Sequence, residues 1–365
     1  MTDAPPTTRL DDLRAWMAGN DLEAAYVTRP VSIAYLTGVR AEPYERLMAL
    51  AVKPDRATLI VPAIEQENAE RAGTDADVDA WRDGEDPYRL VHRALHGTIR
   101  LGVEKDHLTV GAAEALRQRL GAHDHVDIAR EIRRLRRTKS PAEVERLAQA
   151  AAITDTATEE IIGWLHAGQT ELEIAVALGG SIGGGGGTLA FDTLVLSGPN
   201  SALPHGRPSG RQLEKGDLVL LDFGAAFEGY RADTTRVAVV GEPNARQREI
   251  HRVVLAAHDA AIAAVRAGVT TGAIDAAARE VIEAAGLGEQ FFHRTGHGLG
   301  LEAHEDPSLD PASTTMLEAG MVFTVEPGIY FPGWGGVRIE DDLVVEEEGC
   351  RLLTKASRSL RTVPA

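Results

Sequence analysis

The feature that most constrains the fold is a stretch near the middle of the chain, LVLLDFGAAFEGYRADTTRV (Leu218–Val237), in which two buried-strand patterns each contain an aspartate. A short turn around Phe227–Gly229 would join the strands in a hairpin. If the hairpin turns about residues 227 and 228, Asp222 faces Asp233 with Cβ atoms about 5 Å apart. Ionised carboxylates are rarely buried without a partner, and two facing carboxylates repel. The pattern therefore predicts a multivalent cation between them.

The composition excludes several classes of partner. The chain has 365 residues, of which 44% are hydrophobic and 25% charged, as in a globular protein long enough for two domains. Its formal net charge of −17 argues against nucleic acid and anionic membrane surfaces as partners. The single cysteine, Cys350, forms no internal disulfide, and no apolar run reaches the length of about 18 to 20 residues that a membrane helix needs. Because the N-terminus also lacks a signal-peptide pattern, we expect a cytoplasmic protein.

The first third of the chain alternates helical and strand patterns, which predicts an α/β domain. Helical patterns cover Leu10–Gly19, Ile64–Ala72 and Gly111–Leu120, and strand patterns cover Ala24–Thr28, Arg46–Val52 and Ala57–Val61. The domain boundary follows, because Ser140-Pro141-Ala142-Glu143 has the form of a capping box with proline at the first helical position. We expect domains at 1–137 and 138–365, with a long helix from about 141 to Gly168.

The second domain contains an internal repeat. Ala167-Gly168-Gln169-Thr170 and Ala267-Gly268-Val269-Thr270 each follow a long helical pattern and open a shorter one. Each copy then leads to a hairpin with two carboxylates, since MVFTVEPGIYFPGWGGVRIEDDLVV carries Glu326 and Glu340. A chance match of short strings in an alanine-rich chain is the alternative, but the equivalent hairpins favour two duplicated halves that share one site. The glycine run at 179–187 lacks a phosphate-binding pattern and is interpreted as a flexible connection between helix and strand.

Two histidines lie between the hairpins. The stretch RTGHGLGLEAHEDP contains His297, flanked by glycines that let the backbone approach a ligand closely, and His304 seven residues later. One histidine with four carboxylates suits two divalent ions and differs from the thiolate-rich ligand sets of structural zinc sites. Two such ions can share and activate one water, so the pattern predicts a hydrolase.

At these residues the chain resembles the pita-bread metallopeptidases, which include Xaa-Pro dipeptidases (prolidases), aminopeptidase P and methionine aminopeptidase. The resemblance rests on the strings LLDFG, YRADTTR, GHGLGLEAHEDP, VEPGIY and VRIEDD, and it covers about residues 140 to 365. It implies an α/β (α+β) fold in which a small creatinase-like N-terminal domain precedes a pita-bread catalytic domain with pseudo-twofold duplicated halves. It also implies pairing of the chain as a homodimer.

The resemblance implies a dinuclear metal centre made by five ligands. Asp222 would bind one ion, His297 and Glu326 the other, and Asp233 and Glu340 would bridge both. Mn²⁺ is the expected metal, with Co²⁺ or Zn²⁺ as alternatives. A hydroxide bridging the two ions would attack the scissile carbonyl, with Glu326 as the proton shuttle.

Three further residues have roles implied by the same resemblance. His304 would stabilise the tetrahedral oxyanion, and His205 and Arg338 match substrate-site residues of the proline-specific branch that also serve catalysis. The alternatives from the residues alone are a turn histidine for His205 and a neutraliser of the carboxylate cluster for Arg338.

The expected substrates are Xaa-Pro dipeptides or short proline-containing peptides. We predict a dipeptidase, with aminopeptidase P, which releases the first residue of longer peptides, as the alternative. A dipeptidase must bind a free C-terminal carboxylate, and an adjacent cation does this directly. Some prolidases are thought to use an arginine after the His-Glu-x-Pro string, where this chain has Ser308. The hypothesis is that Arg46 serves from a loop of the N-terminal domain, with Arg40 as second choice; a salt bridge within that domain is the alternative for Arg46.

Overall fold

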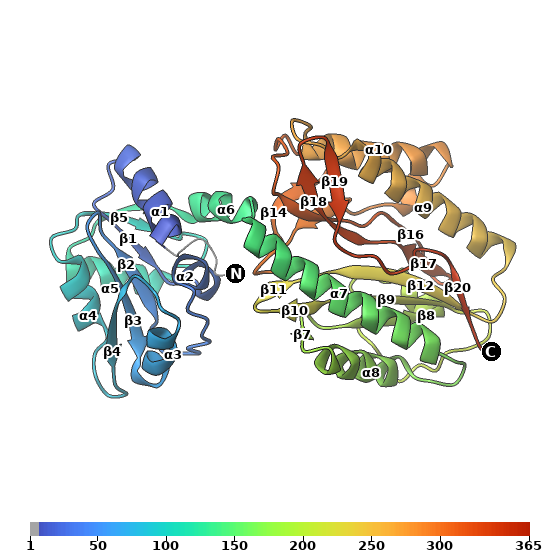
Figure 1. The fold of residues 1–365 in the computed structure, drawn as a ribbon, viewed down its shortest axis with the longest axis horizontal. Helices are drawn as coiled ribbons and strands as arrows, with labels where there is room; N and C mark the ends of the chain where they lie inside the picture. Colours follow the sequence, from blue (N-terminus) through green and yellow to red (C-terminus); the bar gives the residue numbers. More distant parts are fainter. Residues whose placement is uncertain (1–6) are drawn as a thin grey trace. The chain divides into compact units, whose positions relative to one another are not determined.

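The computed structural model describes residues 7–365, and these divide between Arg136 and Arg137 into two compact units (Figure 1). The first unit is an α/β domain, and the second contains four sheets with helices outside them. This confirms the predicted fold class.

The N-terminal unit is built on a six-stranded sheet in the order β4-β3-β2-β1-β5-β6. Its strands are β1 (Ala24–Val27), β2 (Ala49–Val52), β3 (Ala57–Pro62), β4 (Asp77–Trp81), β5 (Arg100–Val103) and β6 (Asp124–Asp127). Its helices are α1 (Thr7–Gly19), α2 (Pro30–Thr37), η1 (Ala63–Glu65), α3 (Gln66–Arg71), α4 (Tyr88–Leu95) and α5 (Val110–Leu120), and α6 (Ala129–Arg137) reaches the division between the units. The strand expected from Arg46 begins only at Ala49, because Arg46 lies in the preceding turn.

The predicted capping box opens the C-terminal unit at α7 (Pro141–Trp164). Ser140 Oγ accepts a hydrogen bond from the Glu143 backbone N–H at 3.3 Å, and the Glu143 carboxylate accepts one from the Ser140 N–H at 2.8 Å. The helix ends at Trp164 and not at Gly168 as expected, because Leu165 adopts an extended backbone conformation.

The repeat seen in the sequence is present in the structure. The helix pair α7 and α8 (Glu171–Gly184) recurs as α9 (Ala245–Ala264) and α10 (Thr271–Ala284). Gly168 and Gly268 both have left-handed backbones, and their N–H groups donate to the carbonyls of Leu213 and Leu317 at 2.9 Å in each case. The same connection built twice confirms the duplicated halves.

The glycine run does not form a flexible connection along its whole length. Helix α8 continues through Gly184, and only 185–187 lead to the next strand. Ile174, Leu178 and Ile182 recur at four-residue spacing and are fully buried, so packing holds the helix together despite its glycines.

The C-terminal unit contains two larger and two smaller sheets, and β20 from the end of the chain joins the sheet of the first half. A four-stranded sheet has the order β20-β12-β9-β8, a five-stranded sheet β14-β13-β15-β18-β19, and smaller sheets β11-β10-β7 and β16-β17. The strands are β7 (Thr188–Leu189), β8 (Leu194–Ser197), β9 (Leu218–Phe223), β10 (Ala225–Phe227), β11 (Tyr230–Arg231), β12 (Thr234–Val240), β13 (Gly296–Gly298), β14 (Glu305–Leu309), β15 (Val322–Val325), β16 (Gly328–Phe331), β17 (Gly335–Arg338), β18 (Asp341–Glu346), β19 (Gly349–Leu352) and β20 (Arg361–Val363). Short 3₁₀ helices are η2 (Gly198–Ala202) and η3 (Gly288–Gln290).

Strand β9 is buried on both faces, which explains its nearly continuous apolar run. Val219 and Leu221 pack with α7 and α8, whereas Leu218 and Leu220 pack with α9 and α10. An isolated bridge between Thr235 and Glu340 links the strand system of the first half to that of the second. The carboxylates of both halves are therefore brought to one place.

The central hairpin has a different register from the predicted one. Its tight turn is centred on Glu228 and Gly229, which have φ angles of 46° and 80°, so Phe227 pairs with Tyr230. Asp222 consequently pairs with Thr235, and Asp233 lies in the break between β11 and β12. The predicted direct opposition of the aspartates is wrong, but a two-residue offset keeps both side chains on one face.

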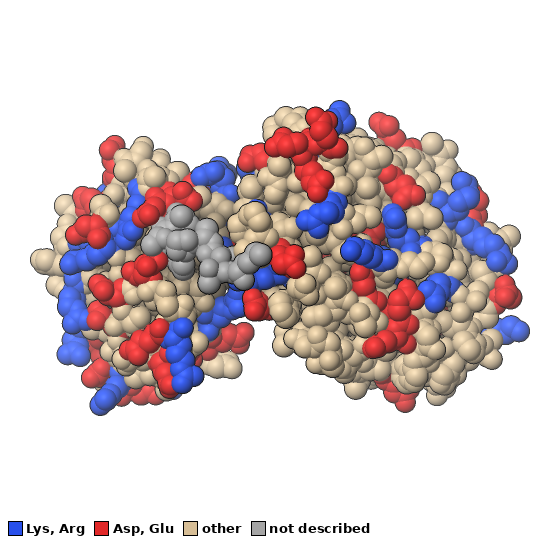
Figure 2. Space-filling view, viewed as in Figure 1, with Lys and Arg blue, Asp and Glu red and all other residues tan. Residues whose placement is uncertain are grey.

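The surface shows no single-sign field on the face in Figure 2, where Lys and Arg are interspersed with Asp and Glu. None of the helices in the described chain combines the length and apolar character needed to cross a membrane.

Candidate active site

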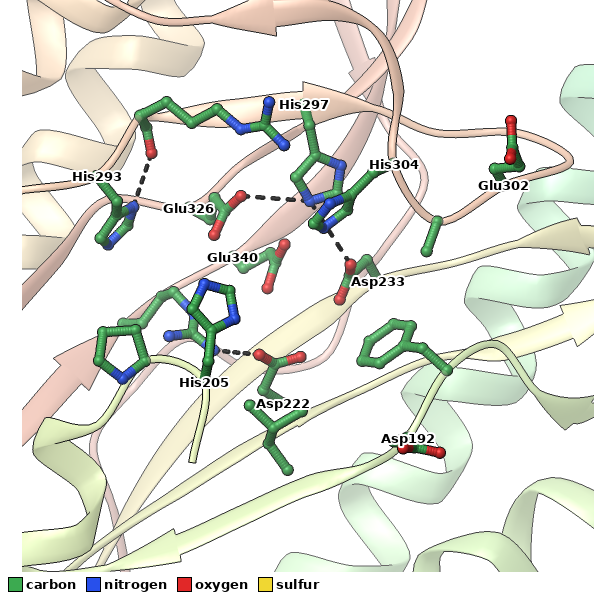
Figure 3. A pocket seen from close by; sticks show the side chains of 16 residues that line it. Asp192, His205, Asp222, Asp233, His293, His297, Glu302, His304, Glu326 and Glu340 are labelled. Atoms are coloured by element: carbon green, nitrogen blue, oxygen red, sulfur yellow. Dashed lines mark hydrogen bonds and ion pairs between the residues drawn. The ribbon is translucent and has the colours of Figure 1, made fainter. Parts of the chain in front are cut away.

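Eight of the nine predicted site residues line one pocket of about 850 Å³ in the C-terminal unit. They are the five predicted ligands Asp222, Asp233, His297, Glu326 and Glu340, together with His205, His304 and Arg338. Figure 3 shows the side chains of both halves pointing into this common space. The cluster is assembled from segments more than 100 positions apart in the sequence.

The second pair of carboxylates is held by a broken hairpin. Val325 pairs with Asp341 and Gly328 pairs with Arg338, so the ladder continues in the same register on both sides of the break. Glu326 and Glu340 lie opposite each other within the break. Both residues lie outside the regular strands, and both side chains line the pocket.

His297 is fixed with one ring nitrogen toward the carboxylates. Its Nδ1 lies 3.1 Å from the Gly298 carbonyl oxygen, which makes Nδ1 the donor and leaves Nε2 as a potential ligand atom. Nε2 is 3.3 Å from a Glu326 oxygen and 3.8 Å from an Asp233 oxygen. The flanking glycine at 298 serves close strand packing and not ligand approach, because a Cβ there would lie 2.2 Å from the Asp306 carbonyl oxygen.

The acidic side chains repel one another. Burial, followed by the charges of Glu340 and Asp222, raises the pKa of Asp233 well above its ordinary value. Burial and the charges of Glu326 and Asp222 do the same for the pKa of Glu340. Burial also raises the pKa of Glu326 to about 7, although Arg338 opposes this. Four acids in such a cluster need a compensating charge when they are ionised.

The donor set fits a divalent metal ion. Ligand atoms of Asp233, His297 and Glu340 lie within 4.8 Å of one another. The Oδ1 atom of Asp233 is buried and has no hydrogen-bond partner in the described chain, which is costly unless a cation binds it. Three oxygen and nitrogen donors of this kind suit Mn²⁺, Co²⁺ or Zn²⁺. Glu326 and Asp222 flank this core of three ligands, so further ligands for a second ion are at hand.

Arg338 neutralises one side of the cluster. Its guanidinium donates to Asp222 and, at 2.8 Å, to the Tyr330 hydroxyl, while its Nε donates to Thr235 Oγ1 at 2.9 Å. The Thr235 hydroxyl in turn donates to Glu340 at 2.5 Å. Asp222 and Glu340 are therefore connected through one arginine and one threonine, and sequence reasoning missed both Thr235 and Tyr330.

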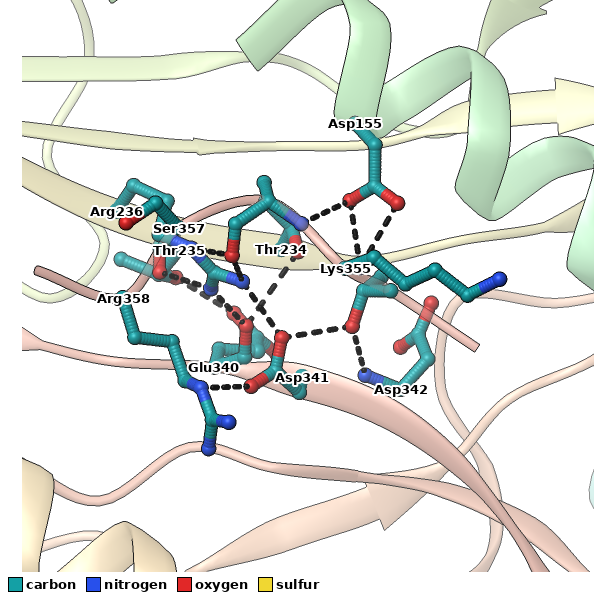
Figure 4. Close-up of polar contacts among 12 residues, drawn as sticks. Asp155, Thr234, Thr235, Arg236, Glu340, Asp341, Asp342, Lys355, Ser357 and Arg358 are labelled. Atoms are coloured by element: carbon teal, nitrogen blue, oxygen red, sulfur yellow. Dashed lines mark hydrogen bonds and ion pairs between the residues drawn. The ribbon is translucent and has the colours of Figure 1, made fainter. Parts of the chain in front are cut away.

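A buried polar layer behind the pocket holds the ligand-bearing strands (Figure 4). Asp342 accepts the Asp233 backbone N–H at 2.9 Å, and Arg236 donates to the Glu340 carbonyl and to Asp341 at 2.6 Å each. Burial raises the pKa of Asp341, but the charges and hydrogen bonds of Arg236 and His258 together outweigh it and lower this pKa to about 2. The layer fixes Asp233 and Glu340 through their backbones.

Histidines form the remaining wall of the pocket. The His304 ring lies 3.9 Å from the His297 ring, centroid to centroid, and His205 is exposed on the loop after η2. His293 was not predicted; it lines the pocket and its Nε2 lies 3.1 Å from the Tyr330 hydroxyl. Burial is the main cause that lowers the pKa of His293 to about 4, so this imidazole is neutral at pH 7.

Arg46 lies in the N-terminal unit. Its guanidinium donates to both Asp83 oxygens at 2.9 Å and to Glu45 at 3.0 Å. The salt bridge considered as the alternative for Arg46 is thus present. A role for Arg46 in substrate binding stays a prediction.

Family models match both units of the chain. The model of metallopeptidase family M24 matches residues 145–347, and that of the creatinase/prolidase N-terminal domain matches residues 9–138. The first match contains all five predicted ligands.

Known proteins are similar over nearly the whole chain. An uncharacterized peptidase of Staphylococcus aureus (strain bovine RF122 / ET3-1) is 38% identical over 349 residues, which cover 95% of this chain and 99% of the relative. The structure of an Xaa-Pro dipeptidase from Bacillus anthracis matches with a TM-score of 0.93 at 34% identity, covering 98% of this chain and 100% of that one. An X-Pro aminopeptidase from Thermotoga maritima matches with a TM-score of 0.89 at 34% identity, covering 97% and 99%. The chain therefore belongs to metallopeptidase family M24 and is a hydrolase of peptides.

Proposed function

We propose that the chain is an Xaa-Pro dipeptidase that hydrolyses the imide bond of dipeptides with two divalent metal ions, of which Mn²⁺ is expected. The observation that carries the proposal is the buried cluster of four carboxylates and one imidazole, in which Asp233 Oδ1 has no partner among the described residues. Two ions held there would supply a hydroxide nucleophile at neutral pH and polarise the scissile carbonyl.

The surrounding side chains have distinct tasks in this proposal. Asp222, Asp233, His297, Glu326 and Glu340 would hold the two ions, which would supply the hydroxide nucleophile. Glu326, whose side chain is largely buried beside His297, takes the proton released during attack. His304, beside His297, donates a hydrogen bond to the developing oxyanion.

Two residues position the substrate. His205 stands exposed at the pocket and contacts the bound peptide next to the scissile bond. Arg338, which is held by Asp222 and the buried Tyr330 hydroxyl, lines the pocket and contacts the proline residue. The homodimer expected from the sequence belongs to the same proposal.

The alternative activity is that of aminopeptidase P. It is supported by the likeness to the Thermotoga maritima X-Pro aminopeptidase, whose identity of 34% equals that of the Bacillus anthracis Xaa-Pro dipeptidase. The test is to measure kcat/KM for Ala-Pro, Ala-Pro-Ala and Ala-Ala with Mn²⁺. A dipeptidase prefers Ala-Pro, an aminopeptidase P prefers Ala-Pro-Ala, and failure to cleave either proline peptide with Mn²⁺, Co²⁺ or Zn²⁺ would overturn the Xaa-Pro assignment.

A further inference from the structure

The pocket contains one arginine without an acidic partner. Arg294 and Arg338 both line it, but Arg338 is engaged with Asp222 and Tyr330. Arg294 donates only from Nη1 to the Ser308 hydroxyl, at 3.3 Å, and it forms no ion pair with any residue between 7 and 365. A guanidinium has five N–H donors, so most of its hydrogen-bonding capacity is unused.

An unpaired guanidinium inside a pocket is poised for an anion. Arg294 is half-buried, and withdrawing a cation from water without a partner costs free energy that a bound carboxylate recovers. The anionic group that every unmodified peptide carries is its C-terminal carboxylate. In an Xaa-Pro dipeptide this group is one residue beyond the scissile carbonyl, and successive Cα atoms are about 3.8 Å apart. The cation that binds it must therefore lie beside the metal ligands.

Arg294 meets this requirement. It precedes strand β13 and reaches Ser308, which is the cross-strand partner of His297. Arg294 also lines the same pocket as His304, the histidine expected to face the scissile carbonyl. Ser308 occupies the position at which some prolidases are thought to use an arginine. Because the Arg294 guanidinium donates to the Ser308 hydroxyl, it lies beside that position.

We propose that Arg294 binds the C-terminal carboxylate of the substrate and thereby selects dipeptides over longer peptides. This inference rests on the proposed Xaa-Pro hydrolysis and names the group that limits substrate length. It assigns to Arg294 the task first considered for Arg46, whose guanidinium already pairs with Asp83 and Glu45.

The test compares Ala-Pro with Ala-Pro-NH₂, which has nearly the same size but no terminal charge. The variants are Arg294→Gln and Arg294→Lys, with Arg207→Gln as a matched control. The Arg207 side chain is 87% exposed, and its guanidinium lies 3.8 Å from an Asp192 oxygen. Arg294→Gln is expected to lower kcat/KM for Ala-Pro by about 10- to 100-fold, mainly through KM, because a charged hydrogen-bonded pair is lost. Ala-Pro-NH₂ should change by less than about threefold, and Arg294→Lys should restore part of the loss.

Other outcomes overturn the inference. If Arg294→Gln lowers kcat/KM equally for Ala-Pro and Ala-Pro-NH₂, Arg294 acts on the fold or the metal centre. If Arg46→Ala loses the preference for Ala-Pro over Ala-Pro-NH₂ and Arg294→Gln keeps it, the role belongs to Arg46. If the wild type with metal hydrolyses neither compound, the proposed function fails. Arg294 is then judged by calorimetric binding of both compounds to the metal-free protein, where equal affinity of wild type and Arg294→Gln for Ala-Pro would reject its role.

Discussion

Replacing Glu326 with glutamine should change how the stability of the metal-free protein depends on pH. The Glu326 side chain is only 15% exposed and lies 3.3 Å from His297. Burial, opposed by the charge of Arg338 and reinforced by that of Asp222, raises its pKa from 4.5 to about 7. Glutamine has nearly the same shape and does not titrate, so the variant removes this charge while keeping the packing.

The sign follows from proton binding. In the unfolded chain Glu326 loses its proton near pH 4.5, whereas in the folded chain it keeps the proton until about pH 7. Between these pH values the folded state binds more protons, so the free energy of unfolding falls as the pH rises. At 1.36 kcal/mol for each pH unit of the pKa difference, the loss reaches about 3 kcal/mol above pH 7. Glu326→Gln should lack this loss.

The assay is urea unfolding in a chelator at several pH values from 4.5 to 8, followed by the fluorescence of Trp164 and Trp334 in the C-terminal unit. Contributions of groups that do not interact with Glu326 are common to both proteins, so they cancel in the difference between the unfolding free energies. Besides burial, the Glu326 charge also raises the pKa of Glu340, and its removal adds to the advantage of the variant. The variant should gain about 3 kcal/mol on the wild type across this range. Parallel pH curves for the two proteins would refute the reasoning. Saturating Mn²⁺ should stabilise the wild type more than the variant.

Two further substitutions test the supporting geometry. Gly224→Ala would place a Cβ 1.7 Å from the Ala232 carbonyl oxygen and should lower the free energy of unfolding by about 3 kcal/mol or more. Gly210→Ala is the control, because a Cβ there meets no atom within 4 Å. Equal melting temperatures of the two variants in thermal unfolding would contradict the hairpin geometry. Thr235→Val removes the hydroxyl that joins Arg338 to Glu340 and should weaken Mn²⁺ binding, measured by calorimetry, about 10- to 100-fold. An unchanged affinity would show that Thr235 does not orient Glu340.

Much of the fold was predictable because its signals are local. The capping box at Ser140 depends on residues three positions apart, and the left-handed glycines at 168 and 268 recur at equivalent points of the two halves. The four proposed carboxylate ligands stand out because a bare carboxylate in a strand pattern is unusual wherever the strand lies, whereas the family resemblance pointed to His297 as the fifth ligand.

The parts that sequence reasoning missed depend on turn geometry and on tertiary contacts. The turn at Glu228 and Gly229 needs two left-handed residues, and centring it one position too early shifted the predicted pairing by two. Arg294 and Tyr330 stand within the strings RTGHGLGLEAHEDP and VEPGIY, but neither string indicates which side chains its residues contact. They belong to the site because the segment before β13 and strand β16 bring them beside it.

The most direct test of the account is the dependence of Ala-Pro hydrolysis on metal. The protein is stripped with a chelator, dialysed and assayed for release of proline before and after addition of Mn²⁺, with the stripped Asp233→Asn variant as a control. We predict that stripping abolishes hydrolysis, that Mn²⁺ restores it in the wild type, and that the variant stays at least about 100-fold less active, since it lacks a bridging carboxylate. Undiminished hydrolysis by the fully stripped protein would contradict the central claim that these carboxylates act by holding metal ions.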